Sequence, residues 1–160
     1  MLGFLKEIFN DTEYEESYSE PGSDSTDDLK VQIATCALFL EIANSDDEFT
    51  DEEKQKIFSI MKKTFNLTGD HVKELIELSE EQVKRSVSLY EFTNIINEKF
   101  SEQRKYEVLK NLWRLIYVDK KLHAYEDYFI RKISANFHLT HKDLIAAKLE
   151  VKAELEKGNK

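Results

Sequence analysis

The sequence predicts an all-α fold, a helical bundle of about seven or eight helices built from two pseudo-symmetric halves. From Ser23 to Lys157 the chain contains no proline and a single glycine, Gly69. A multi-stranded sheet protein needs turn residues roughly every 8–12 residues, so this stretch is predicted to be helical. In addition, a segment that begins at Asp46 returns 73 residues later, at Asp119.

The repeat organises the chain. Its two copies, Asp46–Glu53 and Asp119–Glu126, share an Asp, an apolar residue three positions later and a Glu seven positions later. Each copy follows an apolar segment and precedes a run with helical spacing. After a one-residue deletion, Phe65–Thr68 matches Phe137–Thr140. A repeat of this kind indicates one helical unit used twice.

The first half is expected to contain four helices. The first is apolar on nearly all sides, which is typical of a helix at the centre of a fold. The second begins with a capping box, in which Thr50 and Glu53 satisfy each other's backbone N–H groups. Thr68 is the expected start of the third helix. The expected ranges are Asp28–Asn44, Thr50–Phe65, a stretch from Thr68 to Val87, and Leu89–Phe100.

The second half mirrors the first. A helix over Ser101–Asp119 is the counterpart of the first helix, and Ala124–Phe137 is the counterpart of the second. Thr140 caps the last helix, which we expect to fray from Lys152. Glu41 and Arg114 are equivalent positions, 73 residues apart, in the two central helices. Because elements near a pseudo-two-fold axis meet their counterparts, we expect these two side chains to form a charge-assisted contact.

Charge is concentrated at the start of the chain. Residues 1–28 hold nine acids and one base, which leaves only −1 of the net charge of −9 for the remaining residues. We expect residues 1–28 to be an acidic flexible leader and residues 29–160 to be the helical domain. A nearly neutral body argues against nucleic-acid binding through a basic surface.

Several features favour a cytoplasmic protein. The longest apolar run, Ile33–Ala43, is too short to span a membrane. Met1–Phe9 lacks the basic start and cleavage site of a signal peptide. The only cysteine, Cys36, cannot form an internal disulfide, and it lies in the apolar first helix, so we expect a core residue rather than a nucleophile.

The first ten residues carry apolar side chains at helical spacing. They could anchor the chain to a membrane, but one basic residue is few for that role, so we favour a short helix or hook that docks on the body. We expect the leader to be dispensable for folding but not for function.

The spacing of four motifs resembles that of the TerB-like (tellurite resistance protein B) family. The motifs are Leu38-x-x-Glu41-Ile42-Ala43-x-x-Asp46, Leu89-Tyr90-x-Phe92-Thr93, Leu112-Trp113-Arg114-Leu115-x-Tyr117-x-Asp119, and Tyr125-Glu126. The resemblance covers about Leu29 to Ala147. It implies a two-half helical bundle, a role in bacterial tellurite and chemical stress response, and acidic loops suspected of binding metal ions. Related domains also occur beside J-domains in membrane-linked co-chaperones. The family usually has Asp-Gly at each loop start, whereas this chain has Asp47 and Lys120 as the second residues.

The repeated acids are candidate ligands for a hard cation such as Ca²⁺ or Mg²⁺, which prefers oxygen donors. The candidates are Asp46, Asp47, Glu48 and Glu53 in the first loop, and Asp119 and Glu126 in the second. The same acids also suit structural roles, since Glu53 can cap a helix with Thr50 and Asp46 can accept loop N–H groups. Lys120 disfavours a cation in the second loop. The spacing excludes an EF-hand.

Two functions remain open. The first is a non-catalytic stress-response or scaffold domain that binds protein partners, with weak divalent-cation binding in its two acidic loops. The second is a metal-dependent hydrolase that uses the same Asp and Glu pairs. No stretch resembles an oxyanion hole or a phosphate-binding loop, and His138 and His141 lack further zinc ligands nearby. We therefore favour the first function.

Overall fold

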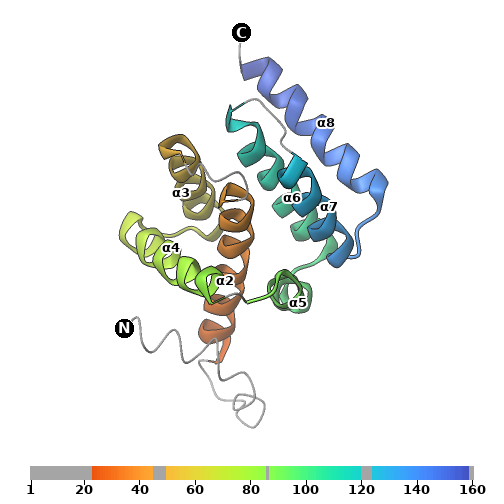
Figure 1. Cartoon of the computed structure of the whole chain (residues 1–160). Coiled ribbons are helices and arrows are strands. Elements are labelled where there is room, and N and C mark those ends of the chain that lie inside the picture. Colours follow the sequence, from red (N-terminus) through yellow and green to blue (C-terminus); the bar gives the residue numbers. More distant parts are fainter. Residues whose placement is uncertain (1–22, 45–49, 86, 120–123, 159–160) are drawn as a thin grey trace.

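The structure, a computed structural model, describes residues 23–44, 50–85, 87–119 and 124–158. These residues form seven α-helices and one 3-10 turn, with no strand among them, which confirms the all-α prediction (Figure 1). The helices are α2 (Ser23–Ala43), α3 (Asp51–Phe65), α4 (Gly69–Lys84), α5 (Leu89–Lys99), α6 (Glu102–Ile116), α7 (Ala124–Asn136) and α8 (His141–Gly158), and the 3-10 turn is η3 (Tyr117–Asp119).

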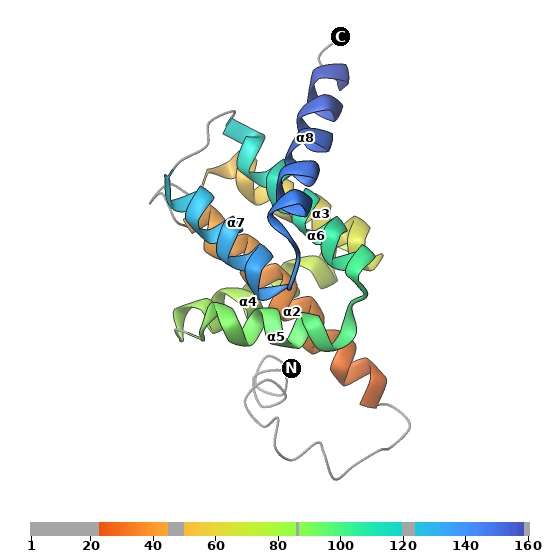
Figure 2. The ribbon, with the colours of Figure 1, turned by 90° about the vertical axis from the view of Figure 1, so that its right-hand side faces the viewer.

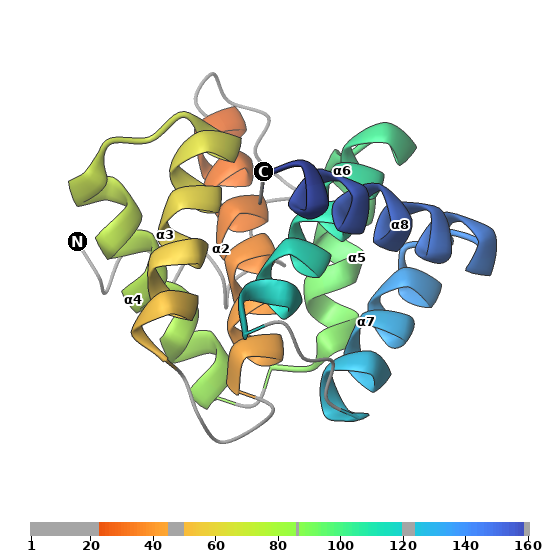
Figure 3. The ribbon, with the colours of Figure 1, turned by 90° about the horizontal axis from the view of Figure 1, so that it is seen from above.

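Six of the seven described helices form two groups of three. Seen from above, α2, α3 and α4 lie on one side, and α6, α7 and α8 lie on the other (Figure 3). The central helix α2 contacts both groups, because it packs against α3 and α4 and also against α5, α6 and α7. Every residue from Ile33 to Leu40 is buried, and the residues on either side of this segment, Gln32 and Glu41, are half-buried. The position of α2 therefore follows from its nearly continuous apolar sequence.

The turns within the two groups confirm the repeat. Asn66 and His138, which are matched residues, both adopt left-handed backbone conformations, with φ of 54° and 63°. Such a residue commonly ends a helix. Two residues later, the Thr68 hydroxyl accepts a hydrogen bond from the His71 amide at 3.3 Å, and the Thr140 hydroxyl accepts one from the Asp143 amide at 3.1 Å. The same turn chemistry thus joins α3 to α4 and α7 to α8.

Helix α5 joins the two halves and supports the end of α7. The side-chain amide of Asn97 donates to the Asn136 carbonyl at 2.8 Å. The buried ammonium of Lys105, on α6, donates to the Phe137 carbonyl at 3.0 Å and to Asn97 Oδ1 at 3.2 Å. The last carbonyls of a helix have no partner within it, so these contacts supply one.

Two helices are longer than the sequence indicated. Helix α2 begins at Ser23 rather than near Asp28, and α8 continues to Gly158 rather than fraying from Lys152. The last turns of α8 are exposed and extend past the rest of the bundle (Figure 2). None of the described helices is long and apolar enough to cross a membrane.

The expected contact between Glu41 and Arg114 is wrong. Arg114 points to α8, where its Nε and Nη2 donate to the two carboxylate oxygens of Glu154 at 2.7 and 2.9 Å. Glu41 is half-buried, and burial raises the pKa of its carboxyl. The two central helices do pack together, but Arg114 lies on the face of α6 that meets α8. The same ion pair joins the last part of α8 to α6.

Candidate functional site

The start of α3 shows how the first acidic loop uses its glutamate. Glu53 Oε1 accepts hydrogen bonds from the backbone N–H and the hydroxyl of Thr50, both at 3.1 Å. In return, the Glu53 amide donates to the Thr50 hydroxyl at 3.1 Å. This is the predicted capping box, and the glutamate in it is only 5% exposed. One carboxylate oxygen of this candidate ligand is therefore committed to starting the helix.

The other candidate ligands are placed less completely. Glu126 is buried in the first turn of α7, as its counterpart Glu53 is in α3. Asp119 ends η3, and its side chain lies outside the described part of the chain. Asp46, Asp47 and Glu48 also lie outside it. Within the described residues, no group of three or more His, Cys, Asp or Glu side chains is arranged to hold a metal ion.

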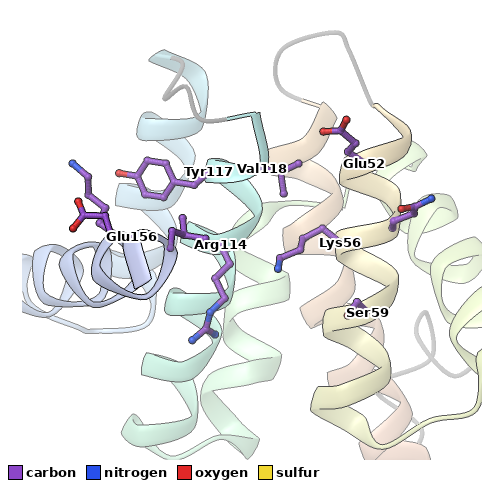
Figure 4. Close-up of a pocket in the computed structure, with 10 residues that line it drawn as sticks. Glu52, Lys56, Ser59, Arg114, Tyr117, Val118 and Glu156 are labelled. Atoms are coloured by element: carbon purple, nitrogen blue, oxygen red, sulfur yellow. The ribbon is translucent and has the colours of Figure 1, made fainter. Parts of the chain in front are cut away.

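A groove of about 680 Å³ lies between α3, the end of α6 with η3, and the end of α8 (Figure 4). Lys56 extends from α3 toward α6, and Val118 and Leu155 form apolar parts of the wall. The lining contains three bases, Lys56, Arg114 and Lys152, and two acids, Glu52 and Glu156. The surface thus combines apolar contact area with charges of both signs.

The Arg114–Glu154 pair fixes one side of this groove. Arg114 is also hydrogen-bonded to Asn111 Oδ1 at 2.6 Å, so its guanidinium is held in place. The hydrogen bond to Glu154 raises the pKa of Arg114, and the same bond lowers the pKa of the Glu154 carboxyl. Both groups are therefore charged at neutral pH, and α8 is tied to α6 where the groove is formed.

A stack of aromatic rings supports the same wall. The Tyr117 ring lies nearly parallel to that of Trp113, with centroids 5.8 Å apart. Trp113 is buried, its indole N–H donates to the Leu144 carbonyl at 3.2 Å, and the Lys148 ammonium lies 5.3 Å from its centroid. Burial raises the pKa of Tyr117. The part of the groove wall formed by Tyr117 is therefore backed by a buried aromatic ring.

Cys36 is a core residue, as predicted. Its side chain is fully buried in α2. Burial raises the pKa of the thiol to about 12, so it stays protonated at neutral pH. A protonated, enclosed thiol is a poor nucleophile.

The comparison of the chain with protein-family profiles gave a match. The sequence profile described as tellurite resistance protein TerB matches residues 32–149. The chain belongs to the TerB family. Neither the comparison with curated proteins nor that with solved structures gave a match. The TerB match takes in both acidic loops but ends before Lys152 and Leu155, so the α8 side of the groove lies beyond it.

Sequence reasoning did not find the groove. It requires knowing that α6 and α8 are held together and that α8 runs past Lys152. One signal was present, since Val151, Glu154 and Leu155 continue the helical spacing of α8 into the charged tail. In the structure Val151 is buried and Leu155 lines the groove.

Proposed function

We propose that this TerB domain is a non-catalytic stress-response module that binds a protein partner in the groove between α3, η3 and α8. The observation that supports the proposal is the groove itself, which has the size of a binding site and combines apolar side chains with charged ones. Apolar contacts flanked by polar ones are typical of sites that bind protein segments.

The chemistry of the groove indicates the kind of segment that fits. Val118 and Leu155 suit an apolar side chain of the partner. Since Glu154 neutralises Arg114, the remaining charges are two lysines and two glutamates. An amphipathic helix with mixed charges on either side of its apolar face matches this arrangement.

Binding is better supported than hydrolysis. A metal-dependent hydrolase would need the repeated acids to reach a substrate or a metal. Glu53 is instead buried, and its Oε1 accepts two hydrogen bonds from Thr50. A carboxylate used in this way is poorly placed for acid–base work, which requires direct reach to the substrate.

The test is affinity capture from the native cell, followed by quantification of the captured proteins. Leu155→Glu and Val118→Glu place a charge in the apolar part of the groove, and we expect each to reduce capture of a specific partner at least tenfold. Leu149→Glu is the matched control, because Leu149 lies on the same helix, is 58% exposed and does not line the groove. Capture that is unchanged by the groove variants, or reduced equally by the control, contradicts the proposal.

We further propose that the first acidic loop binds Ca²⁺ weakly and that the second binds it more weakly still. Both loops carry repeated acids, but Lys120 and Lys121 stand where the first loop has Asp47 and Glu48. A lysine near the ion opposes binding, and each added carboxylate favours it. Cation binding of this kind would not require catalysis.

A further inference from the structure

A second groove, of about 480 Å³, lies between α2, α3 and α4. Four apolar residues line most of it: Leu40, Ile57, Phe58 and Ile76. Two charged residues, Lys54 and Glu80, add one charge of each sign. Leu40 and Ile57 are buried, whereas Phe58 and Ile76 are half-buried and face the opening. The first half of the molecule therefore has an apolar recess between α2, α3 and α4.

The repeat explains why the recess is there. Leu40 is the counterpart of Trp113, 73 residues later. In the second half, the Trp113 indole packs against α8, donates to the Leu144 carbonyl and lies beneath Lys148. Matching Thr68 with Thr140 makes Ile76 the counterpart of Lys148. The recess thus lies at the position where the second half holds the Trp113 ring. In the first half this position has the smaller side chain of Leu40 at the base of the recess.

We propose that this recess binds the chain's own N-terminal segment, Met1–Asn10, with the ring of Phe4 or Phe9 in the position that the Trp113 indole takes in the second half. The segment lies outside the described residues and contains five large apolar side chains after Met1: Leu2, Phe4, Leu5, Ile8 and Phe9. An aromatic ring suits a recess whose counterpart is filled by one.

The length of chain before α2 permits this contact. Leu40 lies 17 residues after Ser23 on α2, a distance of about 26 Å at 1.5 Å per helical residue. Phe9 lies 14 residues before Ser23, and an extended chain of that length reaches about 46 Å. Because the segment is attached, its effective concentration near the recess is of the order of millimolar, so a weak contact is sufficient.

Charge is compatible with the contact. Met1–Asn10 carries one base, Lys6, and one acid, Glu7, and the recess is likewise lined by one of each. The acids that make the leader negative begin at Asp11, beyond the apolar segment. Docking therefore buries apolar surface without bringing net charge into the recess.

The full chain can report this contact by NMR. A nitroxide is attached to the cysteine introduced by Asn10→Cys, while Cys36 is protected by full burial and a pKa of about 12. Wild-type protein treated with the same reagent checks that protection. We expect the label to broaden the amide signals of Phe58 and Ile76 at least fivefold more than those of α8.

Paired variants separate docking from mere proximity. Phe4→Ser with Phe9→Ser, and separately Ile76→Lys, which copies the residue of the second half, should remove the selective broadening. Tyr14→Ser with Tyr18→Ser is the matched control, since it also removes two leader aromatics, and should leave the broadening unchanged. The leader variants touch no described core residue, so their result does not depend on how Ile76→Lys folds.

Three results would overturn the proposal. The first is broadening that spreads evenly along the body or centres on the groove between α3, η3 and α8. The second is broadening that survives the Phe4 and Phe9 substitutions. The third is equal broadening when the label and the ¹⁵N nuclei are on different molecules, which would mean that a second copy supplies the segment.

Discussion

Lys105 shows how a single charged residue stabilises the fold. Its buried ammonium donates hydrogen bonds to the Phe137 carbonyl and to Asn97 Oδ1, at the place where the end of α7 meets α5 and α6. Lys105→Met keeps the apolar stem but leaves both acceptors without this donor. We expect the free energy of unfolding, measured in urea, to fall by about 1–3 kcal/mol, the cost of stranding buried polar groups.

The control for that experiment is Lys110→Met on the same helix. Lys110 pairs with Glu107 at 3.3 Å and with Glu150 at 3.6 Å, and both glutamates are about half-exposed. Exposed ion pairs contribute roughly 0–1 kcal/mol. An equal loss of unfolding free energy for the two substitutions would show that the buried contacts of Lys105 stabilise the fold no more than an exposed ion pair does.

The Arg114–Glu154 pair makes stability depend on pH in a defined direction. Arg114 lowers the pKa of Glu154 in the folded state below 4.5. The pair therefore adds stability above pH 4.5, and this contribution is lost as the pH falls through the folded-state pKa. Glu154→Gln should be slightly less stable than the wild type at pH 7 and equal to it near pH 3, as measured by urea unfolding. Because the carboxylate is 52% exposed, the coupling should not exceed about 1 kcal/mol. A difference that grows on acidification would contradict the assignment.

The acidic loops give a third prediction at this scale. We expect Ca²⁺ to bind the first loop with a dissociation constant of about 10⁻⁴–10⁻³ M, since the sequence lacks the twelve-residue pattern of an EF-hand loop. A titration followed by amide shifts should move the signals of Thr50–Glu53 before those of Ala124–Glu126. Asp46→Asn with Glu53→Gln should abolish the first set of shifts. Shifts confined to the acidic leader would mean that the ions only condense on that segment.

At the scale of elements, the matched turns differ in one respect that can be tested. His138 is exposed and holds a φ of 63°, a conformation that favours glycine, whereas its counterpart Asn66 is a residue that tolerates it better. His138→Gly should raise the free energy of unfolding by about 0.5–1 kcal/mol. Asn66→Gly should change it less. A loss of stability in His138→Gly would show that the imidazole contributes contacts that outweigh the backbone strain.

Sequence periodicity predicted where the helices lie in the chain far better than which helices pack against one another. The capping box at Thr50, the central position of α2 and the match of Phe65–Thr68 with Phe137–Thr140 depend on local chemistry, and all were predictable. The Arg114–Glu154 pair and the length of α8 depend on which helix faces α6, which spacing does not encode. The assumption that equivalent residues must meet failed for Glu41, because a pseudo-symmetric pair of helices touches along only part of its surface.

The candidate site was less predictable than the fold for the same reason. Glu53 was identified both as a possible ligand and as a cap, and the structure places it in the cap. The groove beside it is made by three helices distant in sequence, so no single motif contains it. Leu155 and Lys152 would have been assigned to a frayed tail.

At the scale of the whole molecule, the two halves share one core. Helix α2 packs on helices of both groups, and α3 also contacts α6 and η3. We therefore expect a single cooperative unfolding transition for residues 23–158. The buried apolar residues of the described chain all lie at Val31 or beyond, within this shared core.

Deletion of residues 1–22 tests the role of the leader. The deletion leaves α2 whole and removes no described core residue, so the thermal midpoint followed by circular dichroism should stay within a few degrees. Function should nevertheless change, which affinity capture by the shortened and full chains would show. Deletion of residues 152–160 is the contrasting variant, since it removes Glu154 and the α8 side of the groove while sparing the leader. Loss of a cooperative transition in the first variant would mean that the N-terminal apolar residues belong to the core, and unchanged capture would mean that the leader has no part in partner binding.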